Sequence, residues 1–428
     1  MRKKRVISGV RRRWTVRLYP SLKQTKALEA TAALHCELYN AALQERRDAY
    51  RLHKKSISHT DQALSLKEVK MVRPEFCDVT QMAQNATLRR VELAFAAFFR
   101  RCKERKKAKK SAKLKDDDSA KNVGYPRFKS AKRYRGWDYP RHGNGCKLYP
   151  ETVLVDDEPQ WRNGKLYLQH IGKIKFRGRT SYVGQITTVT IRRHAGLWFA
   201  SIVVESEPRR TAGEGVAGLD WGVETFATLA YGSGDYVQIA NDRLFAQQQG
   251  SAKERQRAAS SALKGKRSKR AQRKHLRIAR AHTALANRRK DRAHKQSAKL
   301  IAKHAAIFTE ELHIANMTAS AKGALVVPGK NVRQKAGLNR EILDTAPGMF
   351  FNMMRYKAEE AGCWIVFFDT RKYKPSQTCP GCAFVRKKPL SERQHVCDCG
   401  FAATRDQAAA LNLLAAGQKL LGQELTSG

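Results

Sequence analysis

The sequence predicts a multi-domain protein in which a β-barrel region precedes an α/β region. Short strand-like runs separated by glycine and asparagine crowd residues 147–204, which is typical of a small barrel. From Val216 onward strand-like and helical stretches alternate, as they do in α/β domains. Residues 207–215 between the two regions are rich in charged and small residues, so we place a domain boundary there.

The charge of the chain indicates its partner. Its 428 residues include 84 Lys and Arg against 38 Asp and Glu, a formal net charge of +46. A chain this basic repels itself unless it binds a polyanion, and the expected polyanion is nucleic acid. No stretch approaches the roughly 20 apolar residues of a membrane-spanning helix, and no long apolar run follows the basic start to suggest a secretory signal. Nine cysteines, four of them near the C-terminus, fit a reducing cytoplasm and a metal site.

The first hundred residues predict one strand and two helices. Residues 13–20 alternate polar and apolar side chains and end at a proline, as a half-buried strand does. Ser21 resembles the N-cap of a helix over residues 22–50, and a second helix is expected over residues 80–106. The basic tract of residues 100–115 predicts a loop, mobile or ordered by RNA, rather than a packed element.

The segment that follows interleaves aromatic side chains with cations. Within Gly124–Lys129, the side chains of Tyr125, Arg127, Phe128 and Lys129 are candidates for stacking on bases and binding phosphates, and a buried Phe-Pro turn is an equal alternative. Strand-like runs then occur at residues 147–154, 165–170, 173–176, 186–193 and 198–204.

The C-terminal half begins with strands ending at Asp220, over residues 225–230 and over residues 236–239. Long helices are expected over residues 252–306, where no acid lies between Glu254 and Asp291. Such a charge run is often a solvated face, but its place between strands that carry acids favours phosphate contact. The predicted contacts are Lys266, Arg267, Arg270, Arg273, Lys274 and Arg277. A strand over 305–309, a helix over 347–361, a strand over 363–368 and a helix over 406–421 complete the pattern.

Three acids, Asp220, Glu310 and Asp406, predict a nuclease that uses Mg²⁺. Hard cations prefer oxygen ligands, and two ions about 3.5 to 4 Å apart can clamp the attacking and leaving oxygens of a phosphodiester. Each acid alone has an ordinary alternative: a turn or N-cap for Asp220, an exposed strand end for Glu310, and a first-turn helix acid for Asp406. Glu311 leaves the register at Glu310 open by one residue. Asp220 lies in a hairpin arrangement of the kind that opens RNase H-like sheets. We therefore expect the three acids to share one site rather than to have three separate ordinary roles.

Four cysteines predict a structural zinc site. Cys379 and Cys382 form a knuckle, and Cys397 and Cys399 follow after 14 residues, a spacing of the zinc-ribbon type. The second pair has one intervening residue where a knuckle has two, so His395 is a conceivable substitute ligand and four reduced thiols in a loop are the alternative. A closed site of this kind stabilises a fold and offers no catalytic opening. The sequence contains no Walker-type glycine loop, so ATP-driven chemistry is not indicated.

An ordered set of motifs resembles TnpB, the transposon-encoded RNA-guided nuclease family and ancestor-like relative of compact type V CRISPR effectors. The motifs are Arg17-Leu18-Tyr19-Pro20, Gly124-Tyr125-Pro126-Arg127-Phe128-Lys129, Gly218-Leu219-Asp220-Trp221-Gly222, Glu310-Glu311-Leu312, Lys374-Pro375-Ser376-Gln377-Thr378-Cys379 and Arg405-Asp406-Gln407-Ala408-Ala409. They run in order through nearly the whole chain. The family's usual Asp-Arg-Asp before the last helix is reduced here to Arg405-Asp406.

The resemblance implies a domain plan. Residues 1–20 and 124–206 would form a wedge β-barrel like those that bind oligonucleotides, interrupted by a helical recognition lobe over residues 21–123. Residues 216–374 and 404–428 would form an RNase H-like RuvC nuclease domain, with a zinc-ribbon insertion that binds target nucleic acid at residues 375–403. Asp220, Glu310 and Asp406 would be the catalytic triad holding two Mg²⁺, and Cys379, Cys382, Cys397 and Cys399 would bind Zn²⁺.

The resemblance also implies a function. The protein would bind a guide (omega) RNA as a monomer, read a short flanking duplex motif, pair the RNA with target DNA and cut double-stranded target and displaced strand as a Mg²⁺-dependent endodeoxyribonuclease. It would act in a bacterial or archaeal cytoplasm, associated with the nucleoid. Alternatives are a transposase or resolvase that acts without RNA, and an RNA-guided repressor that has lost cutting. An RNA chaperone would explain the charge but leave the three acids unexplained.

Overall fold

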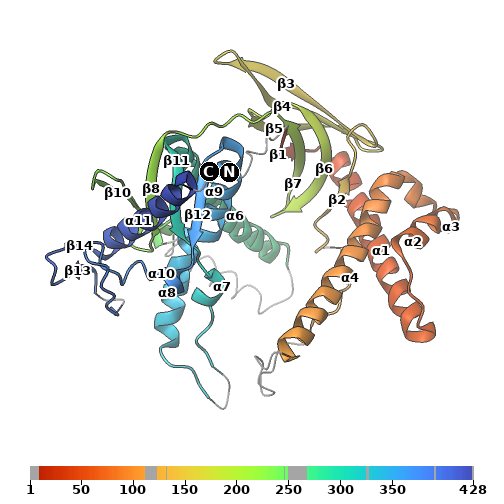
Figure 1. Cartoon of the computed structure of the whole chain (residues 1–428). Coiled ribbons are helices and arrows are strands. Elements are labelled where there is room, and N and C mark those ends of the chain that lie inside the picture. The colour runs from red at the N-terminus through yellow and green to blue at the C-terminus, as the bar shows by residue number, and fades with distance from the viewer. Residues whose placement is uncertain are drawn as a thin grey trace. The chain divides into compact units, whose positions relative to one another are not determined.

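The structure, a computed structural model, describes residues 9–110, 123–131, 133–244, 246–248, 268–323, 327–389 and 392–426. The chain divides into two compact units, which we call the N-terminal unit (Gly9–Glu207) and the C-terminal unit (from Pro208 onward). The first unit is a β-sheet with helices and the second is an α/β domain (Figure 1). The predicted class, a multi-domain protein of mixed α/β and β parts, is confirmed.

The N-terminal unit is built on one antiparallel sheet of seven strands in the order β2-β6-β7-β1-β5-β4-β3. The strands are β1 (Val10–Tyr19), β2 (Gly136–Tyr139), β3 (Cys146–Val155), β4 (Glu158–Leu168), β5 (Gly172–Thr180), β6 (Gln185–His194) and β7 (Leu197–Ser206). Alternate side chains, among them Val16, Trp137 and Phe176, form its core. The sequence predicts a small β-barrel here; in the described strands β2 and β3 are the two ends of the hydrogen-bonded order.

Helices complete this unit. Ser21 and Gln24 form a capping box at the start of α1 (Leu22–His53), as the N-cap prediction requires. α4 (Gln81–Lys110) packs beside α1, and the short helices α2 (His59–Leu64), α3 (Leu66–Val72) and η1 (Pro74–Asp78) lie between them in sequence. The loop predicted for residues 100–115 is wrong up to Lys110, because alanine, lysine, arginine and glutamate are strong helix formers that extend α4.

The C-terminal unit contains a five-stranded sheet in the order β10-β9-β8-β11-β12. The strands are β8 (Gly215–Trp221), β9 (Thr225–Ala230), β10 (Tyr236–Ala240), β11 (His304–Glu310) and β12 (Trp364–Phe368). β8, β9 and β10 form an antiparallel meander, whereas β11 runs parallel to β8 and β12 runs parallel to β11. All five strands lie where the sequence predicts them.

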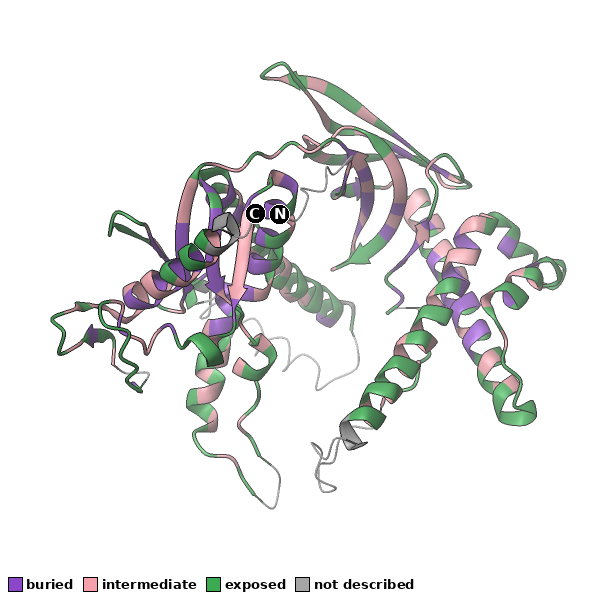
Figure 2. Ribbon diagram, viewed as in Figure 1, coloured by how far each residue is buried: buried purple, intermediate pink, exposed green. Residues whose placement is uncertain are grey.

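Helices cover both faces of this sheet. α6 (Lys269–Lys303), α8 (Val332–Thr345) and α9 (Pro347–Ala361) share a core with Leu219 and Ile307. α11 (Arg405–Thr426) covers the opposite face, where Leu413 and Leu414 share a core with Phe308. Figure 2 shows that the helices carry both buried and exposed residues. The shorter elements are η2 (Ala246–Gln248), α7 (Ile314–Met317), α10 (Thr370–Tyr373), β13 (Gln394–Val396) and β14 (Ala402–Thr404). Residues 252–267 of the predicted basic helix lie outside the described residues.

Two glycines bring α11 into close contact with the sheet. A Cβ atom at Gly218 of β8 would lie 2.1 Å from the carbonyl oxygen of Ala410, and one at Gly417 of α11 would lie 2.0 Å from the Phe308 ring. Because no side chain could occupy either position without displacing these neighbours, the glycines allow helix and strands to touch. This contact sets where the first turn of α11 lies over the sheet.

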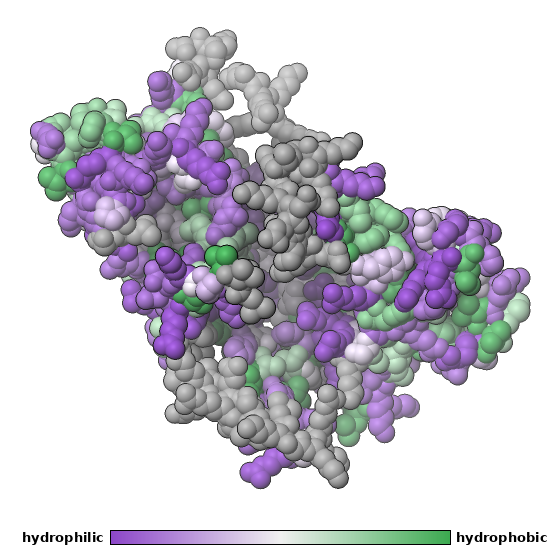
Figure 3. Space-filling view, turned by 90° about the horizontal axis from the view of Figure 1, so that it is seen from below, coloured by the Kyte–Doolittle hydropathy of each residue, from purple (hydrophilic) through white to green (hydrophobic). Residues whose placement is uncertain are grey.

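Polar surface predominates on the face of the molecule shown in Figure 3. Of the helices that the structure describes, none has the length and apolar character needed to cross a membrane.

Candidate functional site

Asp220 and Glu310 lie side by side at the carboxyl ends of two parallel strands. Leu219 of β8 pairs with Thr309 of β11, and the two acids follow at the next position of each strand. Residues at matching positions of parallel neighbours point to the same face of a sheet, here the face that α11 covers. Glu311 is exposed, and its backbone N–H donates to the carbonyl oxygen of Phe368 at 2.8 Å. The sequence leaves open whether Glu310 or Glu311 faces the site; the strand register shows that it is Glu310.

Asp406 joins them from the first turn of α11. A Cβ atom at Gly222, two residues beyond Asp220, would lie 3.8 Å from the Asp406 carboxylate Oδ2. α11 packs against β8, β9 and β11, so its N-terminus lies above the strand ends that carry the other two acids. Three acids from distant parts of the sequence thus meet at one edge of the sheet.

The electrostatics of this acidic cluster favour a bound cation. Burial raises the pKa of Asp220 well above its usual range, and the nearby Glu310 and Asp406 raise it further. Burial raises the pKa of Glu310 to about 7, although the Arg405 guanidinium opposes the shift. Burial also raises the pKa of Asp406, with Arg393 opposing. Neighbouring buried carboxylates repel one another when all are ionised, and a divalent cation between them would stabilise the ionised forms. A set of ligands that are all oxygen atoms suits Mg²⁺.

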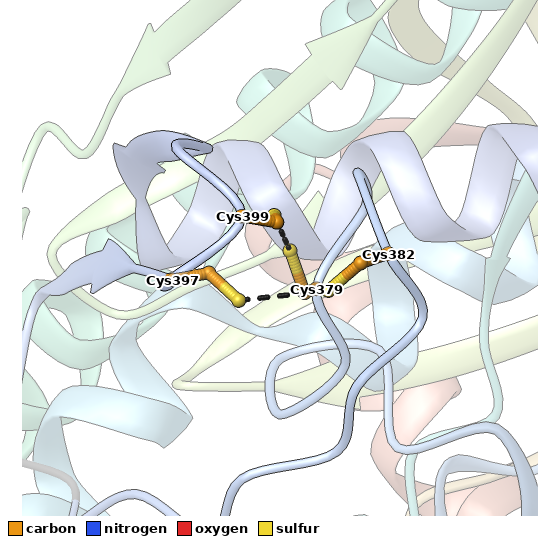
Figure 4. Close-up of side chains that lie close together, drawn as sticks. All are labelled: Cys379, Cys382, Cys397 and Cys399. Atoms are coloured by element: carbon orange, nitrogen blue, oxygen red, sulfur yellow. Dashed lines mark hydrogen bonds between the residues drawn. The ribbon is translucent and has the colours of Figure 1, made fainter.

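The four predicted cysteines form a separate, tighter group. Their sulfur atoms all lie within 4.8 Å of one another, and among the described residues this is the one group of potential ligands that is so compact (Figure 4). The Sγ atoms of Cys379 and Cys399 are 3.6 Å apart, as are those of Cys382 and Cys397. Zn–S bonds of about 2.3 Å place tetrahedral sulfurs about 3.8 Å apart, so the group fits a structural zinc ion.

A tight turn accommodates the short second pair. The N–H of Cys397 donates to the carbonyl oxygen of Phe401 at 3.0 Å, and the N–H of Gly400 donates to the carbonyl oxygen of Cys397 at 3.0 Å. Gly400 has a φ of +87°, a conformation that glycine adopts without strain. The turn follows β13 directly and brings both sulfurs to the same side. One intervening residue is therefore compatible with the site.

His395 is a neighbour of the cysteine group rather than a member of it. The Nζ atom of buried Lys388 contacts Nδ1 of His395, and since a lysine ammonium can only donate, Nδ1 accepts and Nε2 carries the ring proton. Although burial alone would raise the pKa of Cys379, hydrogen bonds from the Cys382 N–H, His395 and the Gly381 N–H lower it to about 6. His395 and Lys388 thus favour the thiolate that binds metal.

Two residues of α11 attach the cysteine loop to the helix that carries Asp406, a role that the sequence analysis assigned to neither. The Arg405 guanidinium donates to the carbonyl oxygen of Pro389 at 2.7 Å. The Asn412 amide donates to the carbonyl oxygens of Pro375 at 2.8 Å and Thr378 at 2.7 Å. Their spacing of seven residues places both on one face of the helix, a signal that was present in the sequence. The helix that positions Asp406 therefore also holds the cysteine loop.

Of the four nucleic-acid contacts predicted at residues 125–129, two pack against helices and two are exposed. The Tyr125 ring packs edge-on against Phe98, with centroids 5.2 Å apart. Lys129 lies with its Nζ 4.0 Å from the centroid of the Tyr39 ring, and the Asn40 amide forms two hydrogen bonds with its backbone, at 2.8 and 2.9 Å. Tyr125 and Lys129 therefore fix the segment to the helices, while Arg127 and Phe128 are exposed.

The cations of α6 share one face. Arg270, Arg273, Lys274 and Arg277 follow the spacing i, i+3, i+4 and i+7, and none of these four forms an ion pair with another described residue. Lys266 and Arg267 lie outside the described residues.

Comparisons with known proteins agree with these features. A family model described as "Probable transposase" matches residues 201–321, and the model of the TNB domain of Cas12f1-like proteins matches residues 348–413. A protein of Streptomyces pristinaespiralis named "Putative RNA-guided DNA endonuclease" is 29% identical over 96% of this chain and 90% of its own length. The Escherichia coli K12 protein "Putative RNA-guided DNA endonuclease InsQ" is 29% identical over 72% of this chain and 73% of its own.

The fold resembles that of a solved structure. The cryo-EM structure of a Cas12f1–sgRNA–target DNA complex aligns with a TM-score of 0.53 at 12% identity, covering 95% of this chain and 99% of that one. At this identity the likeness concerns the fold alone.

Proposed function

Because this chain is a relative of the TnpB family, we propose that it is an RNA-guided DNA endonuclease. The observation that carries the proposal is the meeting of Asp220, Glu310 and Asp406 at the carboxyl ends of β8 and β11 and the start of α11. Relatives that bear this activity in their names align over most of the chain, and the net charge of +46 suits nucleic-acid partners.

The topology supports the proposed domain roles. The five-stranded sheet, with its antiparallel meander and two added parallel strands, supports an RNase H-like RuvC domain at residues 216–374 and 404–428. The cysteine loop, residues 375–403, is the zinc-ribbon insertion, and its attachment to α11 supports this role. Residues 1–20 and 124–206 form the wedge domain, with residues 21–123 as its helical recognition lobe.

In the proposed reaction, Asp220, Glu310 and Asp406 would be the residues that hold Mg²⁺. The chemistry that bound Mg²⁺ would supply at these carboxylates is Lewis-acid activation of water and charge stabilisation at the phosphodiester. Burial of the carboxylates strengthens every charge interaction at the site, because the local dielectric is low. Arg405 lowers the pKa of both Asp220 and Glu310, which favours the ionised forms that bind metal.

Guide RNA is the proposed source of sequence specificity. Base pairing selects the target, while the protein holds the RNA backbone and a flanking duplex motif. The α6 face of Arg270, Arg273, Lys274 and Arg277 offers phosphates four cations that pair with no other described residue, and exposed Arg127 and Phe128 offer a cation and a ring. Lys266 and Arg267, beside this face in sequence, belong to the same proposed contact.

The test is to express the protein with its genomic flank, sequence the RNA that co-purifies, and assay cutting of matched plasmid DNA with Mg²⁺. We expect Asp220→Asn and Glu310→Gln to lower the cutting rate at least about a hundredfold while RNA retention is unchanged, because a metal ligand is lost but the fold is kept. Glu311→Gln is the matched control, and it should cut normally because Glu311 is exposed.

Other outcomes would favour the alternatives. Cutting without any bound RNA would indicate a transposase or resolvase. RNA-dependent DNA binding by the unaltered protein without cutting would indicate a guided repressor.

A further inference from the structure

The four cysteines of the cysteine loop form two close pairs, and each pair joins the two halves of the loop. The Sγ atoms of Cys379 and Cys399 are 3.6 Å apart, and so are those of Cys382 and Cys397 (Figure 4). Cys379 and Cys382 belong to the first half of the loop, whereas Cys397 and Cys399 belong to the second half. Two thiols this close can react with each other once one of them is oxidised.

Each pair combines one exposed cysteine with a less exposed partner. Cys399 and Cys382 are exposed, whereas Cys379 is buried and Cys397 is half-buried. A dissolved oxidant therefore meets Cys399 or Cys382 first, and the partner sulfur lies next to the atom that has reacted. An accessible thiolate beside a second thiol that can resolve it is the arrangement of redox-sensing cysteines.

We infer that the cysteine loop is a reversible thiol switch that responds to hydroperoxides. Cys399 and Cys382 react with the oxidant, and disulfide bonds then join Cys379 to Cys399 and Cys382 to Cys397. The effect of the switch on DNA cutting rests on the proposed function. The two disulfide bonds and the loss of zinc do not depend on it.

The reaction balances with one hydroperoxide for each pair. The exposed thiolate attacks the O–O bond and becomes a sulfenic acid, and the second oxygen takes a proton and leaves as water or an alcohol. The partner thiolate then attacks the sulfenic sulfur, the S–S bond forms, and the hydroxyl takes another proton and leaves as water. Two electrons pass from the sulfurs to the peroxide. Because a disulfide offers no thiolate ligand, oxidation of both pairs releases the metal.

The geometry favours bonds between the halves over a bond within the second half. The Nζ atom of Lys388 in the first half contacts Nδ1 of His395 in the second half, which holds the halves together independently of a metal. A bond between Cys397 and Cys399 would instead close a ring over one intervening residue, where the chain is stiff. The disulfides are therefore expected to link the same two halves that zinc links.

Oxidation would move the loop where it contacts α11. A disulfide bond is about 2.05 Å long, so the sulfur atoms of each pair must approach by about 1.5 Å. Cys379 follows Thr378, whose carbonyl oxygen accepts a hydrogen bond from the Asn412 amide of α11 at 2.7 Å. On the other side of the pair, β14 begins three residues after Cys399. Both ends of the contracted pair are thus close to the helix.

The start of α11 carries this movement to the acidic cluster. β14 leads directly into α11, whose first turn contains Asp406. The N–H of Arg405 donates to the carbonyl oxygen of Arg393 at 2.7 Å, which ties the start of the helix to the second half of the loop. A shift of the loop therefore displaces Asp406 from Asp220 and Glu310, and such displacements slow a reaction strongly. The reduced loop permits cutting, and the oxidised loop suppresses it.

The first test follows the thiols and the metal rather than activity. The full chain with its bound RNA is loaded with zinc and treated with hydrogen peroxide, and zinc release is read with a chromogenic chelator. Mass spectrometry of non-reduced peptides should find the cross-links Cys379–Cys399 and Cys382–Cys397, and a phosphine reductant with added zinc should reverse them. Retention of zinc, irreversible oxidation, or cross-links within the halves would overturn the switch.

Serine variants test the pairing one bond at a time. Cys399→Ser should form the Cys382–Cys397 cross-link alone, whether or not the variant still holds zinc. Cys382→Ser should likewise form the Cys379–Cys399 cross-link alone. A Cys379–Cys382 cross-link in Cys399→Ser would contradict the pairing. Cys77→Ser, which removes an exposed cysteine of the N-terminal unit, is the matched control and should form both cross-links and release zinc as the unaltered chain does.

The last test connects the switch to DNA cutting. Peroxide should lower the cutting rate of the RNA-bound protein about 10- to 100-fold without loss of RNA, and the phosphine with zinc should restore it. Cys77→Ser should respond in the same way. Undiminished cutting by protein that carries both cross-links overturns the switch and leaves the proposed function standing. Protein that forms both cross-links reversibly but cuts matched DNA in neither state refutes the proposed function and supports the thiol chemistry, so the two failures are distinguishable.

Discussion

The contact between Gly417 of α11 and Phe308 of β11 gives the sharpest prediction about the acidic cluster. A Cβ atom at Gly417 would lie 2.0 to 2.3 Å from three ring carbons of Phe308. The ring cannot move aside easily, because it is fully buried and packs against Trp364 with centroids 5.7 Å apart. Gly417→Ala therefore forces α11 away from the strand that carries Glu310.

The magnitude follows from two opposing effects. Replacing a helical glycine by alanine stabilises by about 1 kcal/mol, whereas overpacking a filled core costs about 1 to 3 kcal/mol. Gly422→Ala is a matched control on the same helix, since a Cβ atom there meets nothing within 4 Å. Because both variants share the helical gain, Gly417→Ala should be about 1 to 3 kcal/mol less stable than Gly422→Ala, which corresponds to about 3 to 9 °C in Tm by calorimetry at about 3 °C per kcal/mol for a unit of this size.

A double-mutant cycle isolates the contact. Phe308→Leu should cost much less stability in the Gly417→Ala background than alone, with a coupling of at least about 1 kcal/mol. Because α11 also carries Asp406, Gly417→Ala should slow DNA cutting about 10- to 100-fold, since small misplacements of catalytic groups are costly. Equal stability and equal cutting in Gly417→Ala and Gly422→Ala would refute the reasoning.

Two further predictions concern the cation sites. Without divalent metal, Glu310 has a pKa of about 7 against an ordinary 4.5. Because the folded state then binds the proton more tightly than the unfolded state, the free energy of unfolding should fall by about 3 kcal/mol as pH rises from about 4.5 to 7 and then level off. Calorimetry in EDTA should show that the free energy of unfolding depends less on pH in Glu310→Gln. An unchanged pH dependence would contradict the assignment of the effect to Glu310. His395→Ala should weaken zinc binding about 10- to 100-fold in a competition with a chelator, because the Cys379 thiolate loses a hydrogen-bond donor. Gln394→Ala, at an exposed neighbouring position, is the control and should bind zinc normally. Unchanged zinc affinity in His395→Ala would refute this role of His395.

Several elements could be located from local patterns alone. The capping box at Ser21, the meander that opens at β8 and the limits of α9 follow from residue preferences and periodicity within a few turns of chain. The helix through Lys110 was missed because a run of cations was interpreted as a loop, although its residues favour helix.

The sequence by itself indicated most of the long strands and helices, and it proposed three acids and four cysteines for the chemistry and a polyanion as the partner. Only the tertiary structure decided that Glu310 rather than Glu311 faces Asp220, that one residue suffices between Cys397 and Cys399, and that α11 joins the acidic cluster to the cysteine loop. The physical reason is the distance along the chain between the residues that interact. Strand and helix periodicities depend on near neighbours in the chain, whereas strand register and close backbone contact depend on which distant segments pack together.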